Sequence, residues 1–374
     1  AHSMRPSGAA PPTRAVATST ASRSRSSSRV GSRARSVAPS CSSRDGDEAS
    51  GDGTATSMGE STPVDDKVEA DKPTGAWHHA ESPTGKTLYD VVVSRAGVFA
   101  VGEDGIVVGR CHGIWERIDK DSPNLEVVGN TLYDAATPED GRNVWFCGSS
   151  GAIGVYEPKK QELLDYSAPG EKTSTWETIA VGGTKGNEYI FVGNGSGELL
   201  RGRRDGKAID WVDVREPEGG STLADLEFPT ANVGFLADNS GEVSRTTNAG
   251  GSWNDVGVRG AEHALHSIGA ADEKTLFVSA DAGVVYRYNG TTWTEMNAGQ
   301  AGIHGIDIVD RETGLACSAE GSVYDLTDGR WTEVGSVDNE TLHSIIYGNE
   351  AAPHVAVGAG GTIVERFPSA DSDS

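Results

Sequence analysis

TLYDVVVSRAGVFAVGEDGIVVGRCHGIWERI, residues 87–118, decides the fold, because six further stretches of the chain repeat its pattern. The seven copies begin at Thr87, Thr131, Thr175, Thr222, Ala264, Gly302 and Thr341. Each contains an alternating apolar strand, a loop, a second strand, a glycine-bearing turn and a third strand, and a Trp-bearing fourth strand often follows. Four antiparallel strands repeated about every 40 residues form the blade of a β-propeller. The repeat therefore predicts an all-β protein, a seven-bladed β-propeller.

The turns inside the copies support this prediction. They include Glu103–Gly105 (EDG), Asn239–Gly241 (NSG) and Asp281–Gly283 (DAG), each between two apolar runs. Such turns are hairpin signals, because only glycine readily takes the positive φ that they require. The 49 glycines of the chain, which follow no collagen-like period, agree with many short strands.

The seventh copy is incomplete, and this predicts how the ring closes. It ends near Phe367 after three strands, without a Trp-bearing fourth. The segment Thr74–Glu81 (TGAWHHAE) lies just before the first copy. Its Trp77 corresponds to the tryptophans of other fourth strands, Trp115, Trp253, Trp293 and Trp331. We therefore expect the N-terminal strand to complete the last blade and remove an open sheet edge.

Composition divides the chain into four segments. Residues 1–57, with eight arginines and four acidic residues, are rich in Ser, Arg, Ala and Pro, and we expect them to be disordered. They are interpreted either as a basic arm for RNA or another polyanion, or as non-native sequence ahead of a start at Met58. The abrupt change of charge favours the second. Residues 58–73 are an acidic linker, 74–367 the propeller and 368–374 an acidic tail.

The charge balance limits the partners. There are 55 acidic and 32 basic residues, a net charge of −23, and most of the positive charge is arginine. An acidic, lysine-poor surface stays hydrated where salt is molar and screening is strong, so we predict a salt-adapted cell, with an acidic mesophilic protein as the alternative. Phosphate binding needs a basic stripe that the propeller segment lacks, which argues against nucleic acid.

The cysteines indicate neither a metal knuckle nor a redox motif. Cys41, Cys111, Cys147 and Cys317 form no CxxC pair, and the last two fall in strands expected to be buried, where cysteine packs as a small apolar residue. No stretch approaches 18 apolar residues, and no apolar region follows the N-terminal arginines. A cytoplasmic location is the expectation.

One hairpin resembles a known family. Thr246–Trp253 (TTNAGGSW) fits the Asp-box pattern, and shorter relatives occur at Asn289–Trp293 and Asp328–Trp331. Residues 74–367 resemble the BNR/Asp-box propellers, and most of all the photosystem II stability/assembly factor group.

The box residues have structural roles. In this pattern the polar side chain accepts backbone N–H bonds, the glycine supplies positive φ and the tryptophan wedges between sheets. The residues assigned to these roles are Thr246, Asn248, Gly250, Ser252 and Trp253.

The resemblance also implies a function. It implies a chaperone-like scaffold that docks on a membrane-protein subunit through a basic patch. This sequence departs from that pattern, since its propeller arginines, such as Arg201, Arg203 and Arg204, are few. Sialidases share only the box, and their arginine cluster and Tyr nucleophile have no counterpart at matching positions.

Equivalent positions of the first strands should form rings about the axis. The position two residues into each copy is occupied by Tyr89, Tyr133, Glu177, Ala224, His266, His304 and His343. Three imidazoles from consecutive blades suggest a transition-metal site formed by His266, His304 and His343. The alternative is that they bind channel waters and reflect duplication, since His266 and His343 share the sequence LHSI.

The next position carries Asp90, Asp134 and Asp225, which with Glu177 complete a polar channel ring. Carboxylates suit a hard cation such as calcium. The blades concerned do not all adjoin, so we favour hydrogen bonds from these side chains to neighbouring strands.

No converging acid, base and nucleophile is evident, so the sequence predicts a non-catalytic scaffold that binds a protein partner, as an assembly or stability factor of a larger complex would. The alternative is a metal- or small-ligand-binding propeller that uses the histidines. A glycoside hydrolase, which would need paired carboxylates, is a remote third possibility. We expect a monomeric propeller.

Overall fold

A computed structural model describes residues 75–121, 129–167, 174–206, 208–215, 221–337, 340–349 and 352–368. The predictions for residues 1–57, for the linker 58–73 and for most of the acidic tail fall outside the described residues. Within them, no helix is long and apolar enough to cross a membrane.

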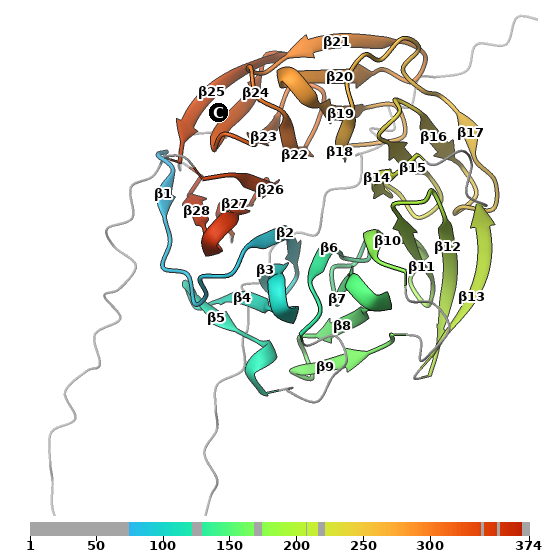
Figure 1. Ribbon diagram of the computed structural model, residues 1–374, viewed down its shortest axis with the longest axis vertical. Coiled ribbons are helices and arrows are strands. Elements are labelled where there is room, and N and C mark those ends of the chain that lie inside the picture. The colour runs from blue at the N-terminus through green and yellow to red at the C-terminus, as the bar shows by residue number, and fades with distance from the viewer. Residues whose placement is uncertain are drawn as a thin grey trace, which may run out of the picture. The chain divides into compact units, whose positions relative to one another are not determined.

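The described chain confirms the predicted seven-bladed β-propeller. It forms seven antiparallel four-stranded sheets, arranged around a common axis in chain order (Figure 1). Each innermost strand contacts the innermost strands of the two neighbouring blades, so the sheets close into a ring. The strands Gly97–Gly102 and Val144–Gly148 are buried at every position, so their blades pack both faces against their neighbours.

The blades have equivalent strands. The innermost strands are β2 (Leu88–Ser94), β6 (Leu132–Ala136), β10 (Trp176–Thr184), β14 (Leu223–Glu227), β18 (Leu265–Ala270), β22 (Ile303–Ile308) and β26 (Leu342–Ile346). The second strands are β3 (Gly97–Gly102), β7 (Val144–Gly148), β11 (Asn187–Asn194), β15 (Gly234–Asp238), β19 (Leu276–Ala280), β23 (Gly314–Ser318) and β27 (His354–Gly358).

The outer half of each blade contains the third and fourth strands. The third strands are β4 (Val107–Cys111), β8 (Ile153–Glu157), β12 (Leu199–Asp205), β16 (Val243–Thr246), β20 (Val284–Tyr288), β24 (Ser322–Thr327) and β28 (Ile363–Arg366). The fourth strands are β5 (Ile114–Arg117), β9 (Glu162–Asp165), β13 (Ala208–Arg215), β17 (Asn254–Asp255), β21 (Trp293–Asn297), β25 (Arg330–Ser336) and β1 (His78–His79). Short helical turns are η1 (Glu103–Gly105), η2 (Asp119–Asp121), η3 (Ser149–Gly151), η4 (Asp281–Gly283) and η5 (Ala359–Gly361).

The predicted hairpin turns have the backbone that their residues suggested. In η1, φ is +58° at Asp104 and +71° at Gly105, and in η4 it is +57° at Ala282 and +76° at Gly283. Positive φ at two successive residues is the tight turn that matches strand twist in a hairpin. Gly241, in the third predicted turn, also has a positive φ of +95°.

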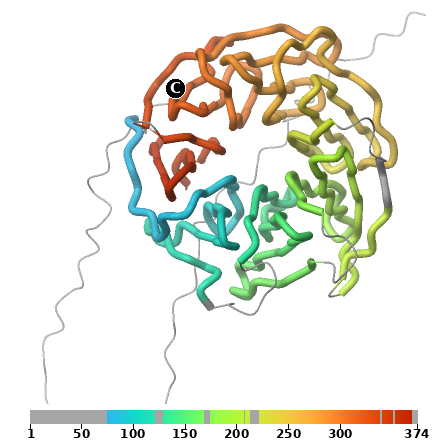
Figure 2. The backbone as a smooth tube through the Cα atoms, viewed as in Figure 1, coloured from blue at the N-terminus to red at the C-terminus, as the bar shows by residue number. Residues whose placement is uncertain are grey.

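The ring closes as predicted, with the N-terminal strand β1 in the last blade. The sheet order is β1-β28-β27-β26, and β1 pairs with β28 through His78 opposite Glu365 and His79 opposite Val364. Figure 2 shows the blue N-terminal segment running beside the red C-terminal blade. The last blade therefore contains both ends of the described chain.

Two adjacent side chains of β28 connect this blade to both of its neighbours. The buried Glu365 carboxylate accepts hydrogen bonds from the Trp115 indole (2.7 Å) and the Arg110 guanidinium (2.7 Å) of blade 1. The Arg366 guanidinium donates two hydrogen bonds, at 2.7 and 2.8 Å, to Asp325 of blade 6.

The hydrophobic core lies between neighbouring blades. Five second strands each bury a phenylalanine almost completely, namely Phe99, Phe146, Phe191, Phe235 and Phe277. Cys147 and Cys317 are fully buried, as predicted.

Close approach to these rings requires glycine in a third strand. A Cβ on Gly154 would stand 2.2 Å from Cε2 of Phe146, well inside contact distance. We therefore expect Gly154→Ala to lower the free energy of unfolding by about 1–3 kcal/mol, measured by chemical denaturation. Gly85→Ala is the control, because a Cβ there would meet nothing within 4 Å. Equal stability of the two variants would contradict this packing.

Candidate binding sites on the propeller

Every innermost strand contains a β-bulge at the position that the repeats aligned. The register with the second strand shifts between Leu88 and Asp90, and at the corresponding place in the other six blades. A bulge leaves an extra residue unpaired and changes the direction of its side chain. The residues in these bulges are the predicted ring, which we call the axial ring: Tyr89, Tyr133, Glu177, Ala224, His266, His304 and His343.

Five aromatic side chains of the axial ring form a continuous arc, which we call the aromatic arc. The ring centroids are 5.3 Å apart for His266–His304, 5.9 Å for His304–His343, 5.1 Å for His343–Tyr89 and 5.4 Å for Tyr89–Tyr133. All five side chains are half-buried. The structure thus brings the three predicted histidines together and extends them with two tyrosines.

The three histidines are not arranged as metal ligands. Among the described residues, no group of three or more His, Cys, Asp or Glu side chains is placed to hold a metal ion. The His266 Nε2 atom is 2.8 Å from an Asp281 carboxylate oxygen. The ring planes of His304 and His343 are parallel within 6°. The nitrogen lone pairs lie in these ring planes, so the lone pairs of the two rings do not point to a common metal position. The metal hypothesis stays a prediction, without support from this geometry.

Burial keeps two of these imidazoles uncharged at neutral pH. Desolvation, followed by the charge of the neighbouring His304, lowers the pKa of His343 to about 4. Desolvation, followed by the charge of His266, also lowers the pKa of His304. The rings of His304 and His343 are therefore uncharged at neutral pH.

The aspartates beside the axial ring connect neighbouring blades, as we favoured from the sequence. Asp90 accepts a hydrogen bond from the backbone N–H of Ala135 (3.0 Å), and Asp134 accepts one from Ile179 (2.7 Å). Asp225 accepts one from Ile268 at 2.7 Å. A bulge interrupts the regular ladder around these amides, and the carboxylate of the preceding blade supplies an acceptor.

Desolvation dominates the ionisation of these carboxyl groups. It raises the pKa of Asp90 to about 6, although hydrogen bonds from Ser344 and from backbone amides act in the opposite direction. The pKa values of Asp134 and Asp225 are raised for the same reason. Desolvation also raises the pKa of Glu177.

Two further blade-to-blade carboxylates were missed by the sequence reasoning. Glu227 accepts a hydrogen bond from the Ala270 N–H at 2.6 Å, and Asp307 accepts one from Tyr347 at 2.7 Å. Glu227 lies two residues after Asp225. Asp307 lies two residues after Gly305, which is the equivalent position in blade 6. Residues two apart in a strand point to the same face of the sheet. Period-two spacing was the signal that could have identified them.

The predicted Asp-box hairpin is held by its own side chains. Thr246 Oγ1 accepts the Gly250 N–H at 2.9 Å, and Asn248 Oδ1 accepts the Ser252 N–H at 2.9 Å. Gly250 has a φ of +75°. Trp253 packs against the core between blades 3 and 4. These contacts stabilise the hairpin and its packing against the core, so the five residues have structural roles.

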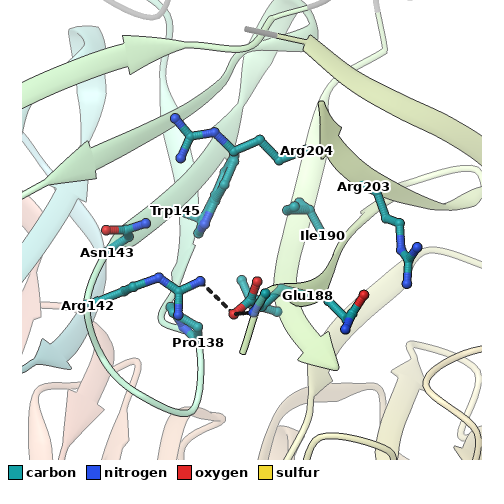
Figure 3. A pocket seen from close by; sticks show the side chains of 11 residues that line it. Pro138, Arg142, Asn143, Trp145, Glu188, Ile190, Arg203 and Arg204 are labelled. Carbon is teal, nitrogen blue, oxygen red and sulfur yellow. Dashed lines mark hydrogen bonds and ion pairs between the residues drawn. The ribbon is translucent and has the colours of Figure 1, made fainter. Parts of the chain in front are cut away.

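A pocket between blades 2 and 3 was not predicted (Figure 3). Its volume is about 210 Å³, and its apolar lining residues include Trp145, Val181 and Ile190. The guanidinium groups of Arg142, Arg203 and Arg204 belong to its walls. The loops that border it follow the ends of β6 and β10, whereas the axial ring lies near the beginnings of the innermost strands.

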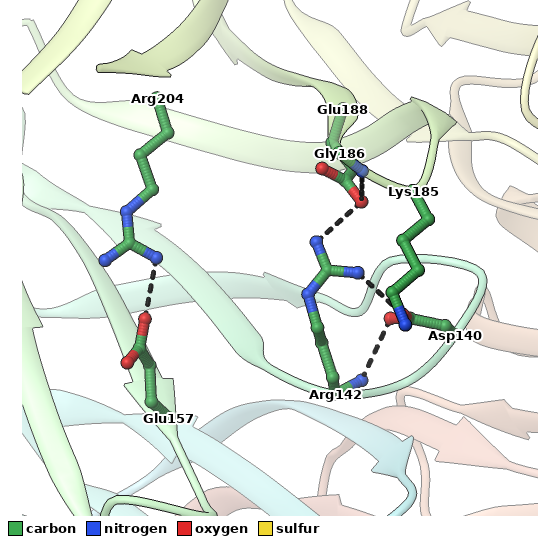
Figure 4. Close-up of polar contacts among 7 residues, drawn as sticks. All are labelled: Asp140, Arg142, Glu157, Lys185, Gly186, Glu188 and Arg204. Carbon is green, nitrogen blue, oxygen red and sulfur yellow. Dashed lines mark hydrogen bonds and ion pairs between the residues drawn. The ribbon is translucent and has the colours of Figure 1, made fainter. Parts of the chain in front are cut away.

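Carboxylates neutralise two of the pocket arginines (Figure 4). Arg142 is 2.6 Å from Asp140 and 2.6 Å from Glu188, and Arg204 is 2.6 Å from Glu157. These ion pairs lower the pKa values of the three carboxyl groups, against desolvation, which is the largest single influence on each.

Among the described residues, Arg203 has no carboxylate partner of this kind. Its guanidinium carbon stands 4.5 Å from the centre of the Tyr189 ring. Among the described residues it forms no ion pair within 4.0 Å. Arg203 is exposed, so its charge is available to a ligand.

Comparisons with known proteins identify the fold. No family model and no curated sequence matches the chain. Among solved structures, YCF48 from Cyanidioschyzon merolae is similar, with a TM-score of 0.61 and 14% identity over 78% of this chain and 99% of that one. A structure of YCF48 bound to a D1 peptide has a TM-score of 0.63 and 14% identity over 80% of this chain and 99% of that one.

Propellers of other classes are equally similar. Virginiamycin B lyase from Staphylococcus aureus has a TM-score of 0.64 and 17% identity over 77% of this chain and 98% of that one. The WD40 domain of Doa1 has a TM-score of 0.59 and 11% identity over 80% of this chain and 99% of that one. At these identities the likeness shows the fold, which both interaction modules and enzymes use.

Proposed function

We propose that the protein is a non-catalytic scaffold that binds an acidic segment of a protein partner in the pocket between blades 2 and 3. The observation that carries the proposal is Arg203, an exposed cation without an ion-pair partner among the described residues, in a chain of net charge −23. Where most of the charge is negative, such a cation on a pocket wall complements a carboxylate of the partner.

Stacking on the Tyr189 ring restricts the conformations of the Arg203 side chain before a ligand binds. The guanidinium groups of Arg203 and Arg201 lie 4.5 and 4.8 Å from the centre of the Tyr189 ring. Arg201 is further held by a hydrogen bond to the Ala249 carbonyl at 3.0 Å. A planar guanidinium held on an aromatic ring loses less conformational entropy when it binds a carboxylate.

The pocket also has room for an apolar group. Trp145 and Ile190 line it beside the three arginines. The segment that fits best has an acidic residue next to an apolar or aromatic one, so that the carboxylate pairs with Arg203 while the apolar side chain covers Trp145 and Ile190.

The similar structures support a protein partner. YCF48 has been determined with a D1 peptide bound, and WD40 propellers occur among the neighbours. The lyase neighbours leave catalysis open at the level of the fold, so the proposal depends on the pocket. The identity of the captured partner would test whether the protein assists the assembly of a larger complex in a salt-adapted cell.

The test compares Arg203→Glu with Arg330→Glu. Arg330 is an exposed arginine of β25, in blade 6, so both variants change the charge equally. Each protein is used to capture partners from its own cells in molar KCl, and the dissociation constant of the recovered partner is then measured directly. We expect Arg203→Glu to weaken binding at least about tenfold, and Arg330→Glu to leave it unchanged. Equal binding by both variants would refute the pocket, and recovery of the chain alone would refute the scaffold.

A further inference from the structure

We infer that the aromatic arc of the axial ring is a second binding site, and that its ligand is an organic cation of the quaternary ammonium type. Five half-buried rings from five consecutive blades stand 5.1 to 5.9 Å apart from one to the next. The faces of such rings carry negative quadrupole potential and attract a cation placed within about 6 Å of them.

The surroundings of the arc are acidic. Asp281 is bonded to His266, at one end of the arc, and Glu177 follows Tyr133 at the other. Glu103 is close enough to influence the ionisation of both Tyr89 and His343. The seven positions of the axial ring contain no lysine or arginine, and neither do the positions that follow them. A cation would therefore meet aromatic faces and carboxylates together.

The character of the ring groups favours a methylated ammonium over a metal ion. A metal needs convergent lone pairs, which the described residues do not provide. A quaternary ammonium needs no hydrogen-bond acceptor, because several ring faces and nearby negative charge replace its hydration. His304 and His343, whose pKa values are lowered by burial, contribute uncharged rings at neutral pH.

This site is independent of the proposed partner pocket. The arc lies near the beginnings of the innermost strands, and the pocket lies beside loops that follow their ends. Such a cation could be a free small molecule or a methylated side chain of a protein, and the experiment distinguishes these two sources.

The test measures binding of choline to the full chain by calorimetry and by NMR of the tyrosine and histidine side chains. The matched probe is 3,3-dimethyl-1-butanol, in which carbon replaces the charged nitrogen of choline at almost unchanged shape. We expect saturable binding of choline at least about tenfold tighter than that of the alcohol, as a few cation–π contacts would give. Equal binding of the two, or no binding of choline, would overturn the inference.

Variants locate the binding. Tyr89→Ala should weaken choline at least about fivefold, and Tyr89→Phe, which keeps the ring, should not. The bulge accepts a small residue, because Ala224 occupies the same position in blade 4. Tyr189→Ala, which removes the ring on which Arg203 stacks, is the control. Unchanged choline binding by Tyr89→Ala would also overturn the inference.

Two peptides that differ only in trimethylation of one lysine identify the source. Tighter binding of the trimethylated peptide than of choline indicates a protein side chain, whereas weaker binding indicates a free small molecule. Either result agrees with a cation site.

Discussion

Glu365→Gln is expected to lower the free energy of unfolding by about 3–5 kcal/mol, the range for removing one member of a buried ion pair. The Glu365 carboxylate is 1% exposed and accepts hydrogen bonds from Arg110 and Trp115 of the next blade. The neutral amide leaves the guanidinium of Arg110, whose side chain is 10% exposed, without its counter-charge. Because Glu365 lies opposite His78 of β1, the loss falls where the ring closes.

Chemical denaturation of the natural protein and four variants tests this expectation. Glu312→Gln removes the same charge from an exposed position and should change stability by less than about 0.5 kcal/mol. In an Arg110→Met background, Glu365→Gln should cost clearly less than in the natural sequence, since no cation is then stranded. An equal cost in both backgrounds would show that the ion pair is not the cause.

His354→Asn is expected to reduce the loss of stability at acid pH. His354 is 4% exposed, and its Nδ1 accepts the Gly348 N–H at 2.9 Å. Burial, and after it the charge of Arg366, lowers its pKa from 6.5 to about 4. Between these values the unfolded chain binds a proton that the folded protein does not. The free energy of unfolding therefore falls as the pH drops from about 6.5 to about 4, and for this group it is constant outside that window.

The size of this effect follows from the shift in pKa. The full difference corresponds to about 3 kcal/mol, so the variant should lose about that much less stability between pH 7 and pH 4. The asparagine oxygen can replace Nδ1 as acceptor for Gly348, which preserves the local contact. The raised pKa of Asp90, about 6, has the opposite effect, because it increases the free energy of unfolding as the pH falls. Asp90 is present in both proteins, so its contribution cancels in the difference between them.

Denaturation curves at several pH values measure this difference. The exposed His79→Asn removes an imidazole from the surface and serves as the control. Parallel pH profiles for the natural protein and His354→Asn would contradict the assigned role.

The fold could be predicted because its signals are local and repeated. Each blade carries its own alternation and turn residues, and Trp77 marks the missing strand of the last blade. The same alignment placed His266, His304 and His343 together, since equivalent positions of a ring must be neighbours. The alignment did not identify the bulges, although the sequence carries a sign of them: the buried residues Leu88 and Val91 stand three apart across the bulge, which breaks the period-two alternation.

The pocket between blades 2 and 3 left no mark that the sequence reasoning could use. Its walls combine Arg142 from one repeat with Arg203 from the next, and neither position is special within its repeat. What matters is which arginine finds a carboxylate. Arg142 pairs with Asp140 and Glu188, whereas Arg203 stacks on Tyr189. Such competition among side chains depends on three-dimensional distances that no spacing in the chain encodes.

The shared last blade also has a consequence for biosynthesis. Strand β1 is made before all seven innermost strands, yet among the described strands it pairs with β28, near the other end of the described chain. At about 5–20 residues per second, β1 leaves the ribosome roughly 15–60 s before β28 is complete. Six blades can form during translation, while the seventh waits for both of its parts. The nascent protein thus passes through an open ring in which two blade faces are exposed to solvent. A chaperone would act most usefully before β1 pairs with β28, because that step covers the exposed apolar surface.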